Sequence, residues 1–396
     1  MPTLEQVFGV TSTQVLSYVE RNDVDDSFRT ALNSGKQIVV YGSSKQGKTA
    51  LVSKYLPYKE NLLVSLTPRT KLIDIYQTIL SNAGVKIQTS TTEKSATESG
   101  VAVSTKVKAF IPLFGAGEAG VDGNTKAGSA AEVKYEEVAV NVELPQSIAT
   151  MLERVGNKRW VILENFHYLD DEVQKQFAFD LRAYQELGVR FVILGVWREK
   201  NRMAQFNGDL LDRTVEVPVE PWREEDFRRV VVKGATELNI TIAPDIVTAA
   251  VEASFSSIGV FQELIKHICK NAGIVDTQSF CLNIFESRYL QAAIHTKAAD
   301  YAARHERALE AIAAGHTSGG AKSDLQPLFL PYYLVRAIIE RGFDGIANGS
   351  NRASIHEWIK TIHHRGEDVR AGDMTNLLDG LAHLQSVRGC KEFCVD

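Results

Sequence analysis

The stretch from residue 36 to residue 53, KQIVVYGSSKQGKTALVS, constrains this chain more than any other. The letters from Gly42 to Thr49 fit the pattern G-x-x-x-x-G-K-[ST], the phosphate-binding P-loop. In such a loop, main-chain N–H groups surround the phosphates of a nucleotide, the lysine reaches the outer phosphates and the hydroxyl residue holds magnesium. Residues 38–41 resemble a buried strand and residues 49–55 the first turns of a helix, so the phosphates would lie at a helix N-terminus. The sequence therefore predicts a nucleotide-binding α/β domain.

Each position of the motif has a predicted role. Gly42 and Gly47 let the main chain approach the phosphates closely, Lys48 is the phosphate cation, and Thr49 is a ligand of Mg²⁺. The predicted nucleotide-binding residues of the loop are Gly42, Ser43, Ser44, Lys45, Gln46, Gly47, Lys48, Thr49 and Ala50. The alternative is a glycine turn that binds nothing, and a match to four fixed positions between a strand and a helix disfavours it.

The bulk properties of the chain are those of an ordinary globular protein. Its 396 residues exceed one typical core, which predicts two or three domains. The formal net charge of −5 gives no general attraction to nucleic acid or to anionic membranes. There is no signal sequence, and no apolar run approaches the ~18 residues of a membrane span. We therefore expect a cytoplasmic protein. Its four cysteines lack the paired spacing of a zinc site and are expected to be reduced thiols: Cys269, Cys281, Cys390 and Cys394.

Further apolar runs alternate with helical patterns after the P-loop. The predicted strands are 61–66, 159–168, 191–196 and 214–219, and the predicted helices between them include 72–83 and 146–155. This alternation is typical of a parallel sheet covered by helices on both faces. Ligands of such sheets bind at the carboxyl ends of the strands, where Gly42, Glu164 and Arg198 all fall.

The segment before the P-loop has an amphipathic pattern. Apolar residues at 15–19 and again at 28–32 predict two short helices, with YVERND between them. Arg21 in this segment has two interpretations. It is either a solvated helix end or, because the P-loop follows closely, part of a cover over the adenine of the nucleotide.

The rest of the chain predicts an insertion and two helical parts. Residues 88–142 are rich in small and polar residues, with an apolar tip at 109–117 and an alternating arm at 133–143. The tip either docks on a neighbour or belongs to a disordered surface loop. Residues 221–298 show helical periodicity throughout, and 315–325 have the composition of a linker. The last segment predicts three helices followed by a short strand pair, SVRGCKEFCV.

Nucleotide hydrolysis needs a magnesium carboxylate at a strand end beside the P-loop, and usually a second carboxylate that orients the attacking water. Glu164 fits the first role, with a helix-capping acid as the alternative. The next residue is Asn165, whose amide cannot accept a proton as a carboxylate does. Hydrolysis is therefore predicted to be slow, or to use another nearby base such as His167 or Asp170, although His167 is also compatible with a packed loop histidine.

Two arginines are candidates for neutralising the negative charge on the γ-phosphate during hydrolysis. Arg198 follows the strand at 191–196, from where it could reach the γ-phosphate. Arg213 precedes the last strand, where it would face the next subunit of a ring or filament and act as an arginine finger. The alternative for Arg213 is a surface arginine that pairs with Asp209 or Asp212.

With these motifs in family order, the chain resembles the AAA+/STAND class of P-loop ATPases, most closely its origin-recognition-like and bacterial conflict-system members. The resemblance covers nearly the whole chain and lies in YVERND, GSSKQGKT, VILENFH, GVWRE, NGDLLDR and PWREEDF. It implies a P-loop domain at 1–220, a helical lid at 221–298, a helix and linker at 299–326 and a winged-helix-like domain at 327–396. It also implies an ATP- and Mg²⁺-dependent switch that forms homo-oligomers and passes its nucleotide state to a partner or effector protein, as in antiphage defence.

Three positions differ from the family pattern. Glu164 replaces the usual aspartate, Asn165 replaces the usual second acid, and Gln262 in SSIGVFQEL stands where a sensor arginine is often found. The first two put fast turnover in doubt, and the third puts closure of the lid on the γ-phosphate in doubt.

Three functions remain open at this point: a switch with a protein partner, a DNA-binding ATPase of the replication-initiation or transposition type, and an ATP-bound scaffold that does not hydrolyse. The third helix of a winged helix normally enters the DNA major groove. Here that helix, AGDMTNLLDGLAHLQ, has two aspartates and neither arginine nor lysine, and residues 327–396 hold eight Lys and Arg against nine Asp and Glu. A surface of that kind attracts phosphates poorly, which favours a protein partner over DNA.

Overall fold

The computed structural model describes residues 1–10, 15–88, 106–112, 135–197, 200–314, 328–346 and 349–387. The chain divides into two compact units, Met1–Ala292 and Ala293–Asp396. Several predictions lie outside the described residues: the side chain of Arg198, most of the apolar tip, the linker at 315–325 and nearly all of the C-terminal strand pair. No helix in the described part of the chain is both long and apolar enough to span a membrane.

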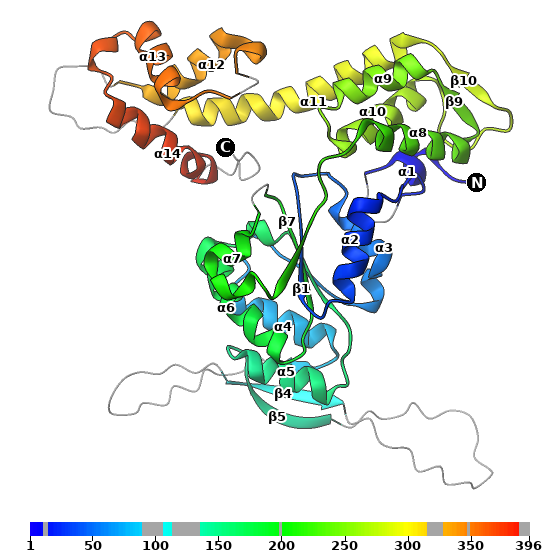
Figure 1. Ribbon diagram of the computed structural model, residues 1–396, viewed down its shortest axis with the longest axis vertical. Coiled ribbons are helices and arrows are strands. Elements are labelled where there is room, and N and C mark those ends of the chain that lie inside the picture. Colours follow the sequence, from blue (N-terminus) through cyan, green and yellow to red (C-terminus); the bar gives the residue numbers. More distant parts are fainter. Residues whose placement is uncertain are drawn as a thin grey trace. The chain divides into compact units, whose positions relative to one another are not determined.

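The first unit is built around a five-stranded sheet in the order β2-β6-β7-β1-β8, in which every neighbouring pair is parallel (Figure 1). This confirms the predicted α/β fold with a parallel sheet. The strands are β1 (Gln37–Tyr41), β2 (Leu62–Ser65), β6 (Val161–Glu164), β7 (Phe191–Gly195) and β8 (Thr214–Pro218). The strand predicted at 159–168 is shorter than expected, because the chain turns into a 3-10 helix, η2 (Phe166–Tyr168), directly after Asn165.

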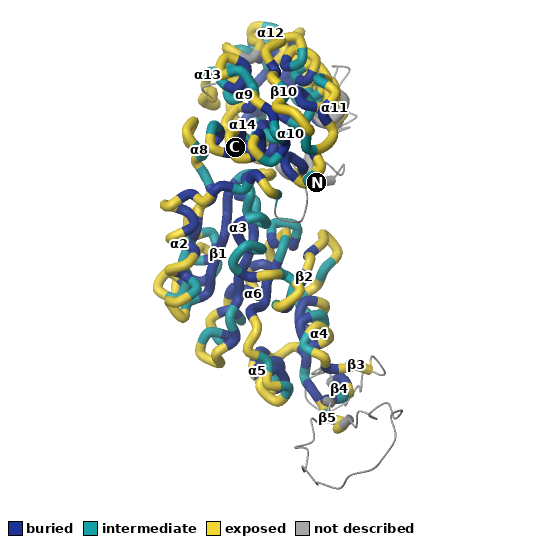
Figure 2. The backbone as a smooth tube through the Cα atoms, turned by 90° about the vertical axis from the view of Figure 1, so that its right-hand side faces the viewer, coloured by how far each residue is buried: buried dark blue, intermediate teal, exposed yellow. Residues whose placement is uncertain are grey.

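Both faces of the sheet are buried, which explains why its strands are apolar runs without polar alternation. On one face, Ile38 and Val40 of β1 pack in a core with α2 (Asn22–Leu32) and α3 (Lys48–Tyr55). On the other face, Val39 and Tyr41 pack in a second core. That second core includes residues of α4 (Leu72–Asn82), α5 (Pro145–Arg154) and α6 (Asp171–Glu186). Figure 1 shows α2 and α3 on one side of β1 and α4 and α6 on the other, and β1 is dark blue in Figure 2 because all of its residues are buried.

A second sheet forms from the insertion. The strands β3 (Lys86–Gln88), β4 (Lys106–Pro112) and β5 (Tyr135–Asn141) pair antiparallel in that order. The alternating arm predicted at 133–143 is therefore a strand. Residues 109–111 of the predicted apolar tip lie inside β4, and their alternate apolar side chains join the core of the first unit.

Residues 221–292 contain three helices, α8 (Glu224–Leu238), α9 (Pro244–Ala253) and α10 (Ile258–Asn271), and we call this region the helical part. The expectation that this part is helical throughout was wrong. Two short strands, β9 (Ile240–Ile242) and β10 (Leu282–Ile284), pair parallel within it.

The N-terminal helix α1 (Leu4–Phe8) packs against α8 and α10 of this helical part. The helix predicted around residues 15–19 was wrong: residues 15–21 contain no helix, and the first of the two short helices is α1. The second is α2, as predicted.

The second unit contains most of α11 (Ser287–Ala314) and the three helices predicted for the last segment, α12 (Leu330–Ile346), α13 (Arg352–Ile362) and α14 (Ala371–Val387). Their apolar residues form a separate core that includes Leu334, Ile359 and Met374. The path of α12 breaks at Gly342, where φ is 64° and ψ is −179°.

Candidate nucleotide-binding site

The P-loop lies between the end of β1 and the start of α3, as the motif requires. Gly42 has φ of +148°, and a Cβ atom there would lie 2.7 Å from Val219 Cγ2, so the loop leaves no room for a side chain. The Lys48 ammonium donates hydrogen bonds to two carbonyls of its own loop, Gly42 O at 2.8 Å and Ser43 O at 2.6 Å. Burial lowers the pKa of Lys48 to about 8. The lysine is thus held over the loop in which phosphates would lie.

Two of the predicted metal ligands contact one another. Thr49 Oγ1, in the first turn of α3, donates a hydrogen bond to Glu164 Oε1 at the end of β6, over 3.0 Å. A hydroxyl and a carboxylate are hard oxygen donors of the kind that Mg²⁺ prefers, together with water and nucleotide phosphates. The two residues therefore fit a magnesium site, and the contact between them spans the edge of the sheet where the strands end.

Tyr58 is a residue at this site that the sequence did not identify. It lies in the 3-10 helix η1 (Tyr58–Glu60), soon after α3, and its hydroxyl donates to Glu164 Oε1 over 2.5 Å. Burial and the neighbouring Glu164 carboxylate raise the pKa of Tyr58 well above its ordinary value. No motif flags this position, because the contact joins residues 106 apart in the chain.

Asn165, at the position of the usual second acid, is exposed and has left-handed backbone angles, φ 62° and ψ 38°. Asparagine adopts this conformation more readily than most residues do, so the backbone gives a local reason for an amide here. The same tight turn leads into η2, which holds His167.

His167 is half-buried, and its Nδ1 has no hydrogen-bond partner among the described residues. Burial, together with the positive charges of Lys48 and Arg202, lowers the pKa of His167 to about 4. The imidazole is therefore neutral at pH 7. Arg202 begins α7 (Arg202–Phe206) and is a second cation near the strand ends that sequence reasoning missed.

A cavity of about 170 Å³ opens beside the P-loop. Its walls come from four separate parts of the first unit, all of them near the P-loop helix. They are the N-terminal segment (Gly9, Val10, Val15, Ser17, Tyr18, Val19, Arg21), the P-loop and α3 (45–51), α8 with its preceding turn (Trp222, Val230) and α10 (Ile258, Gly259, Gln262).

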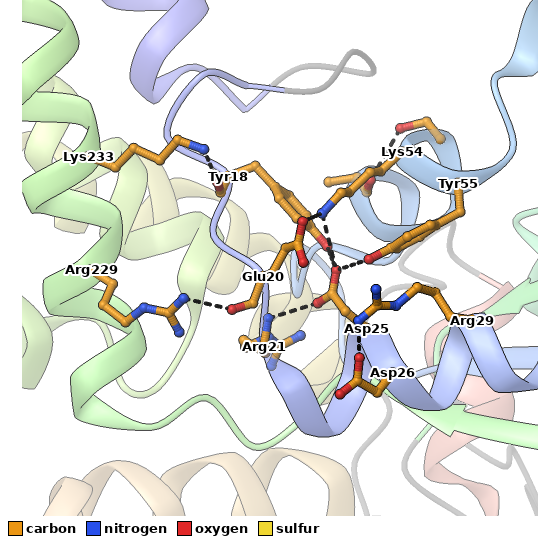
Figure 3. A network of polar contacts seen from close by, with 12 residues as sticks. Tyr18, Glu20, Arg21, Asp25, Asp26, Arg29, Lys54, Tyr55, Arg229 and Lys233 are labelled. Atoms are coloured by element: carbon orange, nitrogen blue, oxygen red, sulfur yellow. Dashed lines mark hydrogen bonds and ion pairs between the residues drawn. The ribbon is translucent and has the colours of Figure 1, made fainter.

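Residues 17–21, which we call the strap, run along this cavity and are held from the side of the sheet by Asp25 (Figure 3). Asp25 is 1% exposed, and its Oδ1 accepts hydrogen bonds from Tyr18 OH at 2.8 Å and Tyr55 OH at 2.9 Å. Its Oδ2 accepts the main-chain N–H of Arg21 at 2.8 Å. One buried carboxylate therefore ties the strap to α2 and to the P-loop helix.

The strap is also held from the other side, by α8. Lys233 Nζ donates to the carbonyl of Tyr18 at 2.6 Å, and Arg229 Nη2 donates to the carbonyl of Glu20 at 2.9 Å (Figure 3). These contacts join residues that are 215 and 209 positions apart. The strap thus connects the parallel-sheet domain with the helical part.

Arg21 lies at the end of the strap and is only 6% exposed, so it is not the solvated helix end of the alternative interpretation. Its Nη1 donates to Val219 O at 2.8 Å, and its guanidinium lies 3.8 Å from the centre of the Trp222 ring. Burial lowers the pKa of Arg21 from its ordinary value. Arg21 also lines the cavity.

The helical part contacts the P-loop directly. At the start of α10 the main-chain N–H of Gly259 donates to Lys45 O at 3.0 Å, and that of Ile258 donates to Gln46 Oε1 at 3.4 Å. A Cβ atom on Gly259 would lie 2.5 Å from Lys45 Cβ, so only glycine permits this approach. The indole of Trp222 donates to Gln46 O at 3.3 Å.

Gln262, at the sensor position, lines the cavity and donates to Ser17 Oγ at 3.4 Å. It therefore contacts the strap. Its amide has no charge to offer a phosphate.

Arg213 does not pair with either of the aspartates expected for a surface arginine. Its Nη2 lies 3.1 Å from Glu186 Oε1, at the end of α6, while Asp209 pairs with Arg182 at 2.6 Å. The Arg213 side chain is 32% exposed. Its pairing partner was missed because Glu186 comes from a helix that is distant in sequence.

Comparisons with known proteins agree with this fold. No protein-family model matches the chain, and neither does any curated protein. Among solved structures, the Walker-type ATPase of Pyrococcus abyssi is similar over 96% of this chain and 93% of its own, with a TM-score of 0.50 and 12% identity. The Orc1 protein of Aeropyrum pernix, in complex with DNA, matches over 93% of this chain and 84% of its own, with a TM-score of 0.44 and 13% identity. The first of these similarities shows that the chain has the fold of a P-loop ATPase.

Proposed function

We propose that the first unit binds ATP with Mg²⁺ and that this protein is a nucleotide-dependent switch of the AAA+/STAND type. The observation on which this depends is the prepared phosphate site. Lys48 lies across its own loop, and Thr49 and Glu164 are in contact at the adjoining strand end. Mg²⁺, when bound with the nucleotide, would neutralise charge on the outer phosphates.

The strap supports adenine as the base. Val19 is 7% exposed and lines the cavity, and within the described residues its main-chain N–H and C=O make no hydrogen bond. Buried main-chain groups need partners. A neighbouring donor and acceptor fit N1 and the N6 amino group of adenine, so we propose that Val19 reads the base while Arg21 and Trp222 close the pocket beside it.

Slow hydrolysis follows from the residues around the γ-phosphate position. Asn165 cannot act as a general base, and His167, although neutral at pH 7, is a weak base because its pKa is about 4. We therefore propose that Lys48 and Arg213 supply charge to the phosphates, with Arg213 acting on the nucleotide of a neighbouring subunit once it leaves Glu186. Arg198 is a further candidate for the γ-phosphate.

The second unit favours a protein partner over DNA. Three of its arginines pair with carboxylates: Arg336 with Glu340, Arg352 with Asp379 and Arg365 with Asp368. A fourth, Arg341, lies 4.4 Å from the ring centre of Trp358. Paired arginines release few counterions from DNA. We propose a homo-oligomer that signals to an effector protein, and the resemblance to conflict-system ATPases leads us to place that role in cytoplasmic antiphage defence.

The central test is nucleotide binding together with assembly. Wild-type protein should bind ATP with Mg²⁺ in preference to GTP and should form larger oligomers with a non-hydrolysable ATP analogue, as measured by light scattering. Lys48→Ala should do neither. If the folded wild type ignores both ATP and GTP at millimolar concentrations, the proposal is wrong.

Hydrolysis and the arginine finger need separate measurements. If the wild type releases phosphate no faster than Lys48→Ala, the protein is a scaffold that binds ATP without hydrolysing it. Mixing Lys48→Ala with Arg213→Ala should restore activity if Arg213 acts across an interface. Duplex DNA binding that tightens at low salt, and is lost when residues 327–396 are removed, would instead favour the DNA-binding ATPase.

A further inference from the structure

The Glu164 carboxylate is held unequally at its two oxygens. Oε1 accepts both Thr49 Oγ1 at 3.0 Å and Tyr58 OH at 2.5 Å. Within the described residues, Oε2 makes no hydrogen bond or ion pair. The two donors therefore fix one oxygen and leave the other with its lone pairs available.

The two donors lie at the start of α3 and just after its end. Thr49 lies in the first turn of α3, and Tyr58 follows three residues after the end of that helix at Tyr55, beyond Pro57. Both donors therefore come from one short stretch of chain, α3 and the 3-10 helix η1 that follows it. The carboxylate at the end of β6 is held by that stretch alone among its described contacts.

Glutamate needs such support more than aspartate does. Its side chain has one more rotatable bond, so its carboxylate can occupy more positions relative to a metal that Thr49 binds. A hydrogen bond from outside the ligand set commonly fixes the orientation of a metal ligand and strengthens the metal site.

We propose that Tyr58 is a positioning residue that holds Glu164 Oε1 so that Oε2 faces the Mg²⁺ of a bound nucleotide. In this way the tyrosine compensates for the longer side chain at a position where the resembled family has aspartate. The proposal depends on the proposed nucleotide binding, and it concerns the metal and not the phosphates themselves.

The experiment is a Mg²⁺ titration of Tyr58→Phe with a fluorescent ATP analogue. Affinity measured in EDTA should match that of the wild type, because the contacts of the phenol are with the two predicted metal ligands, Glu164 and Thr49, and not with Lys48. The Mg²⁺ concentration for half-maximal tightening should rise about 10-fold, the lower end of the range for residues that support a metal ligand.

Tyr289→Phe is the matched control. The Tyr289 hydroxyl also donates to a glutamate, Glu286, at 3.4 Å, but it lies on α11, away from the P-loop. This variant should keep the wild-type Mg²⁺ dependence. An unchanged dependence in Tyr58→Phe as well would overturn the proposal while leaving nucleotide binding intact, whereas a wild type that binds no analogue would contradict the proposed function itself.

A second pair of variants separates positioning from simple packing. Glu164→Asp shortens the side chain so that it no longer meets Tyr58 in the same way. Adding Tyr58→Phe to Glu164→Asp should then change the Mg²⁺ dependence less than twofold. A full 10-fold effect in both backgrounds would mean that Tyr58 acts elsewhere, and the proposal would fail.

Discussion

The candidate nucleotide site has a phosphate end and a base end, and the two are built in different ways. The phosphate end comes from one continuous stretch, Gly42 to Ala50, and the side chains of Glu164 and Tyr58 adjoin it at Thr49. The base end is assembled from the strap, α8, α10 and Trp222. These parts lie up to 245 residues apart and meet through side chains such as Gln262 and Lys233. The phosphate end therefore depends on local sequence, and the base end on whether distant parts of the unit stay closed. Inorganic tripolyphosphate, which can occupy only the phosphate end, distinguishes the two experimentally.

The largest expected effect is at the phosphate end. Lys48→Ala should weaken both ATP and tripolyphosphate about 100-fold, since hydrogen bonds from a charged donor contribute roughly 1.5–3 kcal/mol each. Calorimetric titration with both ligands measures this. Lys59→Ala, which removes an exposed lysine near the same helix, is the control and should change neither affinity. A loss confined to ATP would contradict the division between the two ends.

Asp25→Asn should affect the base end alone. The Asp25 carboxylate accepts hydrogen bonds from Tyr18 OH, Tyr55 OH and the Arg21 N–H, and an amide has only one oxygen with which to accept them. The loss should destabilise the closed strap by about 2 kcal/mol, which corresponds to a roughly 30-fold loss of ATP affinity. Tripolyphosphate should bind as it does to wild type. The neighbouring Asp26→Asn changes an exposed carboxylate and should leave ATP affinity within twofold. Equal losses for ATP and tripolyphosphate in Asp25→Asn would show that the ends are not separable.

Gly259→Ala tests the contact that joins the two ends. The added methyl group would overlap Lys45 and should weaken the hydrogen bonds of the first turn of α10 to the P-loop, with about a 10-fold loss of ATP affinity. Gly208→Ala adds the same group where nothing lies within 4 Å, and we expect no change. Thermal unfolding of both variants would confirm that each is folded. Wild-type affinity in Gly259→Ala would mean that the helical part does not need its close approach.

The smallest effect is a pH dependence that belongs to the phosphate end. The pKa of Lys48 is about 8 in the free protein, and a bound triphosphate favours the charged ammonium and raises it. Binding therefore takes up a proton at alkaline pH, and affinity for tripolyphosphate should fall about fourfold between pH 7 and pH 8.5. Lys48→Arg stays charged over this range and should not show the decline. A parallel decline in the arginine variant would assign the effect to another group.

The phosphate end is encoded locally and the base end by distant parts of the chain, and this difference explains which features could be predicted from the sequence. The P-loop was found because its spacing is fixed locally, and the sheet because buried parallel strands are apolar runs. The strap was taken for a helix since the apolar residues at 15–19 fit a helical period, yet Val19 faces the cavity and Tyr18 binds Asp25. Tyr58 and Glu186 were missed because their partners, Glu164 and Arg213, come from other strands or turns. Roles assigned to individual site residues stay predictions.

The place of Trp222 gives the protein an internal optical probe. Its indole N–H is bonded to a carbonyl of the P-loop and its ring lies against the Arg21 guanidinium, so both the polarity and the charge around this fluorophore are set at the meeting point of loop, strap and helical part. Indole emission shifts with just these surroundings. The colour and lifetime of its emission should follow occupancy of the pocket in unlabelled protein, and Trp222→Phe would identify which part of the signal it contributes.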